Sequence, residues 1–189
     1  MKYKINLIMM MLLSLLLIGG CGKQEITDYN NNTMTIGKDD TIRDVSIEDF
    51  ANGDYNMQDL EQFVNNEIGK YNSDAGSERI TLADFNTDNK VARLQLVYAS
   101  IEDYNSFNHT EYSLKSWSDS VLTGSLTSVA DQQEVPVSEI EDNEYKVLSI
   151  DDAMDLVFEG KALYYNSNIT ARDGVYTANG DGTAVVVFK

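Results

Sequence analysis

The residues best suited to chemistry in this chain are a single cysteine, Cys21, and a single histidine, His109. Nucleophilic catalysis by serine or cysteine needs a positioned imidazole base, and His109 is the only candidate for that role. It lies in the polar run Asn108-His109-Thr110-Glu111 with no nucleophile motif beside it, which favours a surface loop. A structural zinc site needs about four cysteine or histidine ligands. The sequence therefore predicts neither kind of centre.

Three side chains with oxygen ligands recur at two-residue spacing: Asp84, Asn86 and Asp88. This spacing matches the first half of an EF-hand calcium loop. The match fails where a turn glycine is required, because Asn89 stands there, and Gln95 replaces the bidentate glutamate. The flanking residues are typical of strands. We therefore predict no metal site and interpret residues 86–89 as a hairpin turn, with Asp84, Asn86 and Asp88 kept as an alternative calcium site.

Carboxylates are the other abundant chemical group, since the chain has 31 aspartates and glutamates. A pair of them can carry glycoside hydrolysis, and 11 tyrosines with Trp117 offer rings on which sugars stack. The sequence does not say which acids lie together, so no catalytic residue is assigned. It contains no phosphate-binding loop and no dinucleotide fingerprint, and no cofactor is expected.

The N-terminal residues have the pattern of a targeting segment. Lys2 and Lys4 precede an apolar run from Leu7 to Ile18, which is about twelve residues long. A helix needs roughly 20 residues to cross a bilayer, so this run is too short to span one. Its length and the flanking charges indicate a signal peptide.

The end of that run, Leu15 to Cys21 with Gly19 and Gly20 before the cysteine, resembles the lipobox of bacterial lipoproteins. The resemblance implies cleavage between Gly20 and Cys21 and a diacylglyceryl group on the Cys21 thiol. It implies a signal peptide at 1–20, the lipidated cysteine with a flexible tether at 21–33, and one extracytoplasmic α+β domain at 34–189. Two acyl chains anchor a protein stably in a bilayer, so the implied location is the cell membrane, on its extracytoplasmic face.

The chain is strongly acidic, with a formal net charge of −17. Removal of residues 1–20 takes away Lys2 and Lys4 but no acids, which brings the charge to −19. Nucleic-acid binding depends on basic patches and is excluded on this ground. The bilayer contact must come from the Cys21 lipid and not from the protein surface. The remaining length suits one domain.

In the first half of the chain the pattern predicts strands at 33–36 and 41–47, an antiparallel pair at 80–85 and 91–98, and helices at 57–71 and 101–107. The longer helix has its apolar residues on one face, which predicts that all of them pack in the core. These residues are Met57, Leu60, Phe63, Val64, Ile68 and Tyr71.

In the second half, residues 108–145 show no clear pattern. A strand is expected at 146–148, then a helix from Ile150 to Glu159 with Gly160 as its C-cap. Strands are expected at 161–165, 174–177 and 183–188. The run Asn179-Gly180-Asp181-Gly182 is typical of a hairpin turn between the last two.

One short pattern occurs three times, beginning at Ser46, Ser100 and Ser149 and continuing as Ile-Glu-Asp or Ile-Asp-Asp. Serine followed by acids is typical of a helix N-cap, because the hydroxyl accepts an unpaired amide and the acids suit the helix dipole. We interpret the copies as separate candidate caps, since four residues are too few to indicate a repeat.

Together these features predict an α+β fold, with an antiparallel or mixed β-sheet and two to three helices packed on one face. In its acidity, its abundance of asparagine and aspartate and its near lack of proline, the chain is similar to small lipoproteins of Gram-positive gut bacteria. The expected role is a non-catalytic module that binds a protein or glycan ligand. A surface hydrolase that acts on wall or glycan polymers and a calcium-dependent adhesion module are the alternatives.

Overall fold

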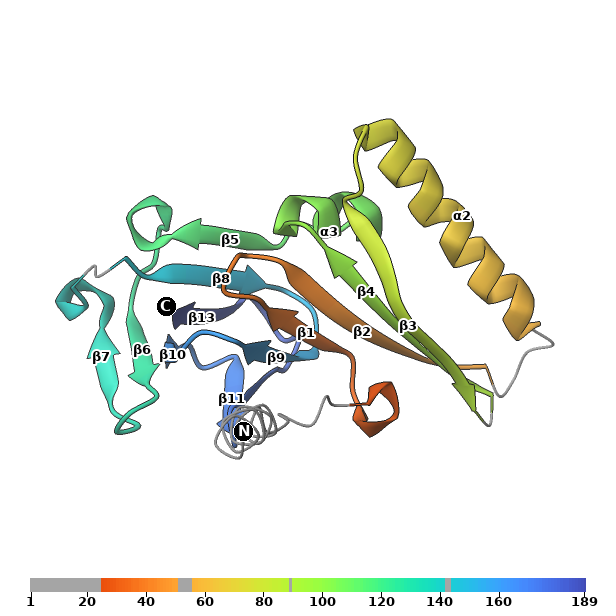
Figure 1. Ribbon diagram of the computed structural model, residues 1–189. Helices are drawn as coiled ribbons and strands as arrows, with labels where there is room; N and C mark the ends of the chain where they lie inside the picture. The colour runs from red at the N-terminus through yellow and green to blue at the C-terminus, as the bar shows by residue number, and fades with distance from the viewer. Residues whose placement is uncertain (1–24, 51–55, 89, 142–143) are drawn as a thin grey trace, which may run out of the picture.

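The computed structural model of this chain describes residues 25–50, 56–88, 90–141 and 144–189 (Figure 1). These residues form two α-helices and 13 strands in two sheets, one mixed and one antiparallel. The predicted class, helices combined with a mixed or antiparallel sheet, is confirmed. The finer prediction that the helices pack together on one face is not confirmed.

The larger sheet, sheet A, is mixed because β1 pairs in parallel with β9, Thr33 lying opposite Asp155 and Ile36 opposite Phe158. Its other neighbours are antiparallel. In spatial order sheet A contains β11 (Ile169–Arg172), β12 (Val175–Ala178), β9 (Met154–Phe158), β1 (Thr33–Ile36), β2 (Ile42–Asp49), β4 (Val91–Tyr98) and β3 (Ile80–Asp88).

The smaller sheet, sheet B, is built around β13, in which every residue is buried. The sequence Ala-Val-Val-Val-Phe suits a strand covered on both faces, which needs no polar alternation. Tyr164 and Tyr165 of the neighbouring strand lie against two different apolar clusters, one on each side of the sheet. In spatial order sheet B contains β5 (Ser113–Ser116), β8 (Lys146–Ile150), β13 (Ala184–Phe188), β10 (Ala162–Tyr165), β6 (Ser125–Ser128) and β7 (Glu134–Pro136).

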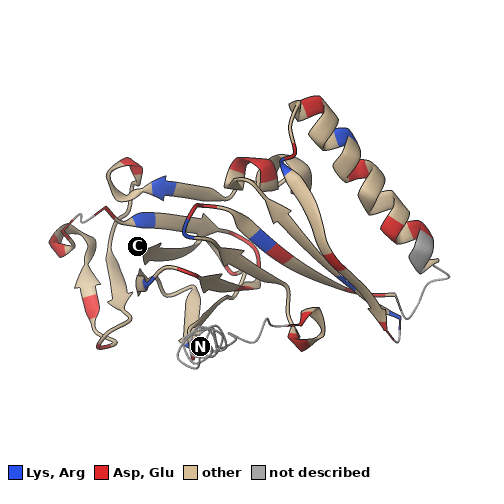
Figure 2. Ribbon diagram, in the orientation of Figure 1, with Lys and Arg blue, Asp and Glu red and all other residues tan. Residues whose placement is uncertain are grey.

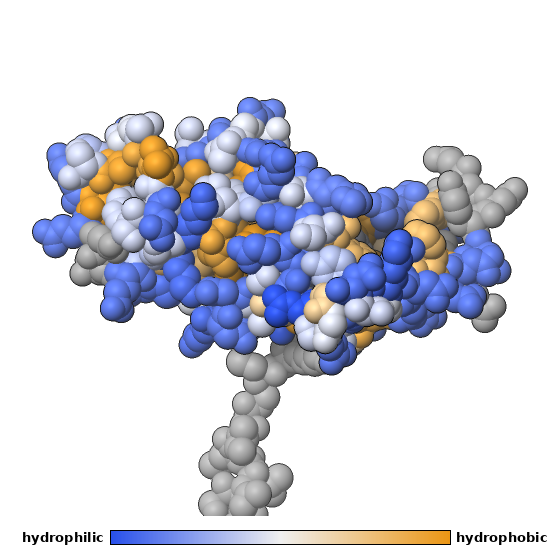
Figure 3. Space-filling model, turned by 90° about the horizontal axis from the view of Figure 1, so that it is seen from above, coloured by the Kyte–Doolittle hydropathy of each residue, from blue (hydrophilic) through white to orange (hydrophobic). Residues whose placement is uncertain are grey.

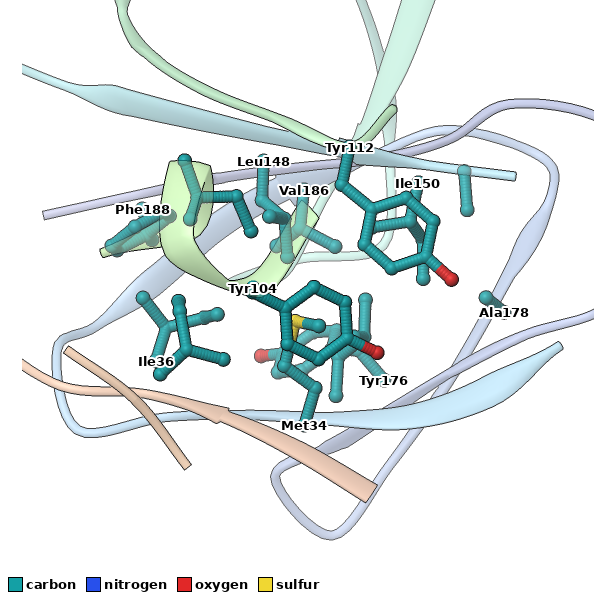
Figure 4. Close-up of a cluster of buried hydrophobic side chains, with 14 of the residues drawn as sticks. Met34, Ile36, Tyr104, Tyr112, Leu148, Ile150, Tyr176, Ala178, Val186 and Phe188 are labelled. Carbon is teal, nitrogen blue, oxygen red and sulfur yellow. The ribbon is translucent and has the colours of Figure 1, made fainter. Parts of the chain in front are cut away.

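The main core lies between the two sheets (Figure 4). Tyr104 and Tyr112 stack within it, with ring centroids 5.5 Å apart, and the Tyr112 hydroxyl donates a hydrogen bond to the Asp152 carboxylate. Burial of this apolar surface is the main source of stability for a domain without disulfides. Figure 4 labels Met34 and Ile36 from β1 below these rings, and Leu148, Ile150, Val186 and Phe188 from sheet B on the opposite side.

Helix α2 (Met57–Ala75) lies outside the β3–β4 hairpin, and α3 (Ile101–Asn108) covers the end of β4 (Figure 1). Short 3₁₀ helices occur at η2 (Ile26–Asp28), η3 (Trp117–Asp119) and η4 (Val137–Glu139). The predicted elements of the first half are all present, with ends moved by a few residues. The turn expected at 86–89 comes later, because β3 continues to Asp88.

The helix expected from Ile150 to Glu159 is wrong, since Met154–Phe158 forms strand β9. Its apolar residues pack as a strand between β1 and β12, so sheet pairing outweighs local helix propensity. Gly160 is not a helix cap. A Cβ atom at that position would lie 2.5 Å from the Lys189 carbonyl oxygen, so glycine permits the close approach of the C-terminal backbone.

The hairpin expected at Asn179–Gly182 is also wrong. This segment joins β12 of sheet A to β13 of sheet B, and the two strands do not pair. The hairpin lies one turn earlier, where Asp173 and Gly174 join β11 to β12 with φ of 51° and 83°. Positive φ at both positions is what a two-residue type I′ turn requires, and Asp-Gly is a preferred pair for it.

Only one of the three serine patterns caps a helix. Ser100 precedes α3, and its Oγ accepts a hydrogen bond from the Asp103 amide at 3.3 Å. Ser46 lies within β2 and Ser149 within β8. The pattern is therefore compatible with both a cap and a strand, and the residues that follow decide between them.

The described part of the expected tether contacts the domain. Ile26 is buried, and the Asn31 amide donates to the Asp155 carboxylate at 2.9 Å. The Asn32 side-chain oxygen accepts the Ile47 amide at 2.8 Å, so the chain follows the sheet from before Thr33. Cys21 and Gly20 lie outside the described residues. Across the described ranges, none of the helices has the length and apolar character that crossing a bilayer would demand.

Candidate functional site

The best candidate site is a cleft between α2, the end of α3 and the strands beneath them, with a volume of about 510 Å³. We name it the α2 groove. Pockets of 300–1,000 Å³ are the usual size for small ligands. Its described lining residues are Ser46, Phe63, Val64, Glu67, Lys70, Tyr71, Asp74, Leu94, Leu96, Tyr98, Ser106, Phe107, Asn108 and His109.

The floor of the groove follows from strand register. Leu94, Leu96 and Tyr98 are alternate residues of β4, so their side chains point to one face of the sheet. Ser46 lies directly opposite Leu94 on β2 and completes the floor. Tyr98 is fully buried, and its hydroxyl accepts a hydrogen bond from the Asn108 amide at 3.1 Å. The floor is therefore mostly apolar, with Ser46 as its polar member.

The outer wall is α2, which packs less completely than its sequence predicts. Ile68 is the buried residue among those described on this helix, while Val64 and Tyr71 are partly buried. Phe63 is 60% exposed, although the apolar stripe placed it in the core. Phe63 lines the groove and remains exposed.

A small second compartment of about 80 Å³ adjoins the groove beneath the first half of α2. The two hollows share Ser46, Val64 and Leu94 as lining residues. The other described residues of the small compartment are mostly apolar, and they are Glu48, Phe50, Leu60, Phe85 and Ala92. The two hollows therefore lie side by side, the larger one with charged residues in its lining and the smaller one mostly apolar.

Asp103 fixes the helices that form the two walls. Its carboxylate accepts two hydrogen bonds from the Arg79 guanidinium, at 3.1 and 2.6 Å. It also accepts one from the Tyr71 hydroxyl of α2 at 3.2 Å and one from Ser100 Oγ at 2.8 Å. Burial acts to raise the pKa of Asp103, but the hydrogen bonds from Arg79, Ser100 and Tyr71 outweigh it and lower that pKa.

Asp44 is a second buried carboxylate, 6% exposed, close to the groove but not part of its lining. It lies on β2 two residues before Ser46, opposite Leu96 and Met34. Its hydrogen-bond partner among the described residues is Ser46 Oγ, at 2.7 Å. Burial raises the pKa of Asp44 to about 6, against the opposite effect of that hydrogen bond.

The neighbours of Asp44 are tyrosines. Tyr98, Tyr104 and Tyr112 all have a pKa raised first by burial, with the charge of Asp44 adding to the effect. No cation is among these groups, which explains why Asp44 is not held ionised as Asp103 is. Sequence reasoning missed Asp44. A signal was present, because Ile42, Asp44 and Ser46 alternate along a strand whose inward face should be apolar.

The alternative calcium residues do not form a loop. Asp84, Asn86 and Asp88 lie at alternate positions of strand β3. An extended strand does not wrap its side chains around a cation as a calcium-binding loop does. Asn86 pairs across the strands with Arg93, whose positive charge opposes a cation there. Among the described residues no cluster of three or more His, Cys, Asp or Glu side chains is suited to a metal. The calcium site stays an untested prediction.

His109 is exposed, as expected for a surface histidine, but it has a defined position. It ends α3 in the left-handed conformation, with φ of 57°, and its backbone amide donates to the Asn105 carbonyl. This places the side chain at the mouth of the α2 groove. No nucleophilic serine or cysteine is hydrogen-bonded to it among the described residues, so the geometry supports no catalytic dyad.

A further hollow of about 370 Å³ lies where the N-terminal segment crosses sheet A. Asn30, Asn31, Asn32, Asp155 and Thr177 provide its polar lining. The Asp155 carboxylate already accepts hydrogen bonds from Asn31 and from Thr177 Oγ1 at 2.6 Å. These groups satisfy one another and fasten the segment, which makes this hollow a structural junction.

Comparisons of the chain with family models, with curated proteins and with solved structures found no match.

We predict that Asp103→Asn destabilises the protein by about 1–3 kcal/mol at neutral pH, because an amide cannot accept all four hydrogen bonds. Urea unfolding followed by circular dichroism measures the effect. The difference should shrink as the pH falls through the lowered pKa of Asp103, where the wild-type carboxylate is itself protonated.

The matched control is Asp173→Asn, since Asp173 and its ion-pair partner Arg172 have side chains 89% and 88% exposed. Its unfolding midpoint should equal that of the wild type. Equal effects of the two substitutions would contradict the role given to Asp103.

We predict the opposite sign for Asp44→Asn. The folded state holds the Asp44 proton up to a pKa of about 6, so between the ordinary value of 3.8 and pH 6 the wild type loses stability as the pH rises. The variant carries no such penalty and should be more stable at pH 7.5 by up to about 3 kcal/mol, and by little at pH 4. Thermal unfolding at both pH values tests this, with the exposed Asp84→Asn as control. A gain in stability that is the same at both pH values would contradict the raised pKa assigned to Asp44.

Proposed function

We propose that this chain is an extracytoplasmic binding module, anchored to the cell membrane by a lipid on Cys21, whose ligand site is the α2 groove. In this proposal α2 and α3 pack on the same face of sheet A and form the two walls. The alternate residues Leu94, Leu96 and Tyr98 support that arrangement, because one face of β4 meets both helices.

The observation that carries the proposal is a hollow of ligand size that has a mostly apolar floor and a large exposed aromatic residue in its lining. Phe63 and Val121 are the exposed large hydrophobic residues among those described, and Phe63 lines the α2 groove. Figure 3 shows apolar surface in separate patches between hydrophilic residues on the face that it presents. An exposed apolar residue beside a cleft is typical of a binding surface.

A carboxylate hydrolase is the second candidate, and Asp44 is the observation that favours it. Such an enzyme needs an acid with a raised pKa beside a second carboxylate, both in reach of the substrate. Asp44 has the raised pKa, but Ser46 and not Asp44 lines the groove. Binding without catalysis is therefore the better-supported function. Hydrolysis of a glycan or wall polymer that is lost in Asp44→Asn would reverse this order.

We predict that Cys21→Ala abolishes lipid attachment, because the alanine side chain has no thiol to accept a diacylglyceryl group. Cells grown with labelled palmitate should give a labelled wild-type band and an unlabelled variant band, and the variant should be released or mislocalised. Thr27→Ala, which keeps the thiol, should label like the wild type. Labelling of Cys21→Ala would contradict the anchor.

We predict that Phe63→Ser weakens the binding of Nile red, a neutral apolar dye, by about five- to thirtyfold, since burying an aromatic ring against a ligand is worth about 1–2 kcal/mol. Dye fluorescence titration measures it. Val121→Ser is the matched control, because Val121 is 94% exposed and does not line the groove. Both variants should keep the wild-type melting temperature. Equal loss of dye binding in both would contradict the groove as the site.

A further inference from the structure

We propose that the α2 groove binds a single-chain organic cation, with its hydrocarbon tail toward the small compartment and its ammonium head at the mouth. This inference rests on the proposed function, because it names the ligand class of the same site. Three features of the described residues carry it: the shape of the space, the charges at the mouth and the aromatic rings beside them.

The shape favours an unbranched tail. The hollow of about 510 Å³ lies beside one of about 80 Å³, and Val64 and Leu94 line both of them. Leu60, Phe85 and Ala92 are among the apolar residues that make up most of the lining of the small hollow, with Ser46 and Glu48 as its polar members. A hydrocarbon chain loses nothing on entering such a space, whereas a polar ligand would lose its hydrogen bonds to water.

The mouth favours a positive head. Glu67 and Asp74 of α2 line it together with one cation, Lys70. None of these three side chains takes part in an ion pair with a described residue. Figure 2 shows acidic residues along α2. The C-terminal end of α3, where the helix dipole is negative, also borders the mouth. The net charge of −17 adds attraction at longer range.

Aromatic rings next to the carboxylates add a specific contribution. Tyr71 and Phe107 both line the groove and meet edge to face, with centroids 5.8 Å apart. The face of an aromatic ring attracts ammonium groups, most strongly where water is excluded. A fatty acid would instead place its carboxylate beside Glu67 and Asp74, which repel it. A docked helix is about 10–12 Å across and exceeds a space of this volume.

The test is calorimetric titration of the full-length chain carrying Cys21→Ala, with decyltrimethylammonium below its micelle concentration. Decanoate supplies the same tail with a negative head, and tetramethylammonium supplies the head alone. We expect decyltrimethylammonium to bind at least about tenfold more tightly than either, and its affinity to rise about two- to fourfold for each added CH₂ until the space is filled.

The charge test is the double variant Glu67→Gln with Asp74→Asn, which should weaken decyltrimethylammonium about three- to tenfold and reduce the salt dependence of its binding. Its matched control is Glu134→Gln with Glu139→Gln, two exposed residues of β7 and η4 that do not line the groove. The control should bind like the parent chain.

The outcomes separate this inference from the proposed function. Tight decanoate binding that Phe63→Ser weakens and the charge variants do not change would overturn the cation and leave the groove as a binding site. If the chain binds a basic amphipathic peptide but does not bind decyltrimethylammonium, the organic cation is also overturned and the groove remains a binding site. If no probe binds, including Nile red, both the ligand class and the proposed function fail.

Discussion

The hydrogen bonds to Asp103 are the interaction on which the rest of the site depends. One carboxylate joins Tyr71 of α2, Arg79 at the start of β3 and Ser100 at the cap of α3. Nearby, the Asn72 side-chain oxygen accepts the amides of Arg79 and Ile80 at 2.8 and 3.0 Å. The C-terminal end of α2 is thereby fixed to both neighbours, which sets the separation of the groove walls.

Helix α2 does not bury all of its apolar side chains. Among its described residues Ile68 is buried and Val64 and Tyr71 are partly buried, whereas Phe63 is 60% exposed. The groove lies along this incompletely packed face of the helix, from Phe63 to Asp74. Burying Phe63 there would release apolar area from water and is the ordinary outcome for an amphipathic helix. A ligand that covers Phe63 would gain that free energy instead.

Two buried carboxylates show how position decides the role of an acid. Asp103 receives four hydrogen bonds, two of them from a cation, and its pKa is lowered. Asp44 receives one from a serine and has tyrosines around it, and its pKa is raised to about 6. At neutral pH Asp103 stabilises the protein, whereas Asp44 lowers its stability. This difference depends on contacts between residues far apart in the sequence.

Much of the sheet structure follows from local sequence, because alternating and β-branched residues such as those of β4 and β13 specify strands. The Ser100 cap and both helices could also be predicted. The strand at Met154–Phe158 could not, since its parallel pairing with β1 joins residues about 120 positions apart and its pattern also fits a helix. The α2 groove could not be predicted from the sequence for a similar reason. Phe63 has the spacing of a core residue, and only the placement of α2 over β4 leaves it exposed.

The turns show the limit of pattern reasoning in another way. Asp173-Gly174 and Asn179-Gly180 are both favourable turn pairs, but only the first joins paired strands. The second carries the chain from sheet A to sheet B, and its backbone is fixed by a bond from the Asn179 amide to the Asn168 carbonyl. Which sheet receives the next strand is decided by the core, because β13 must be covered on both faces.

An NMR titration of the chain with decyltrimethylammonium, observing backbone amides and side-chain methyl groups, tests whether the α2 groove is the ligand site. We expect saturable shifts at Val64, Leu94 and Leu96 in the groove, with Val121 and the residues of η3 and η4 unchanged. Shifts concentrated around Val121 and Trp117, or no saturable shifts at any residue, would contradict the groove as the ligand site.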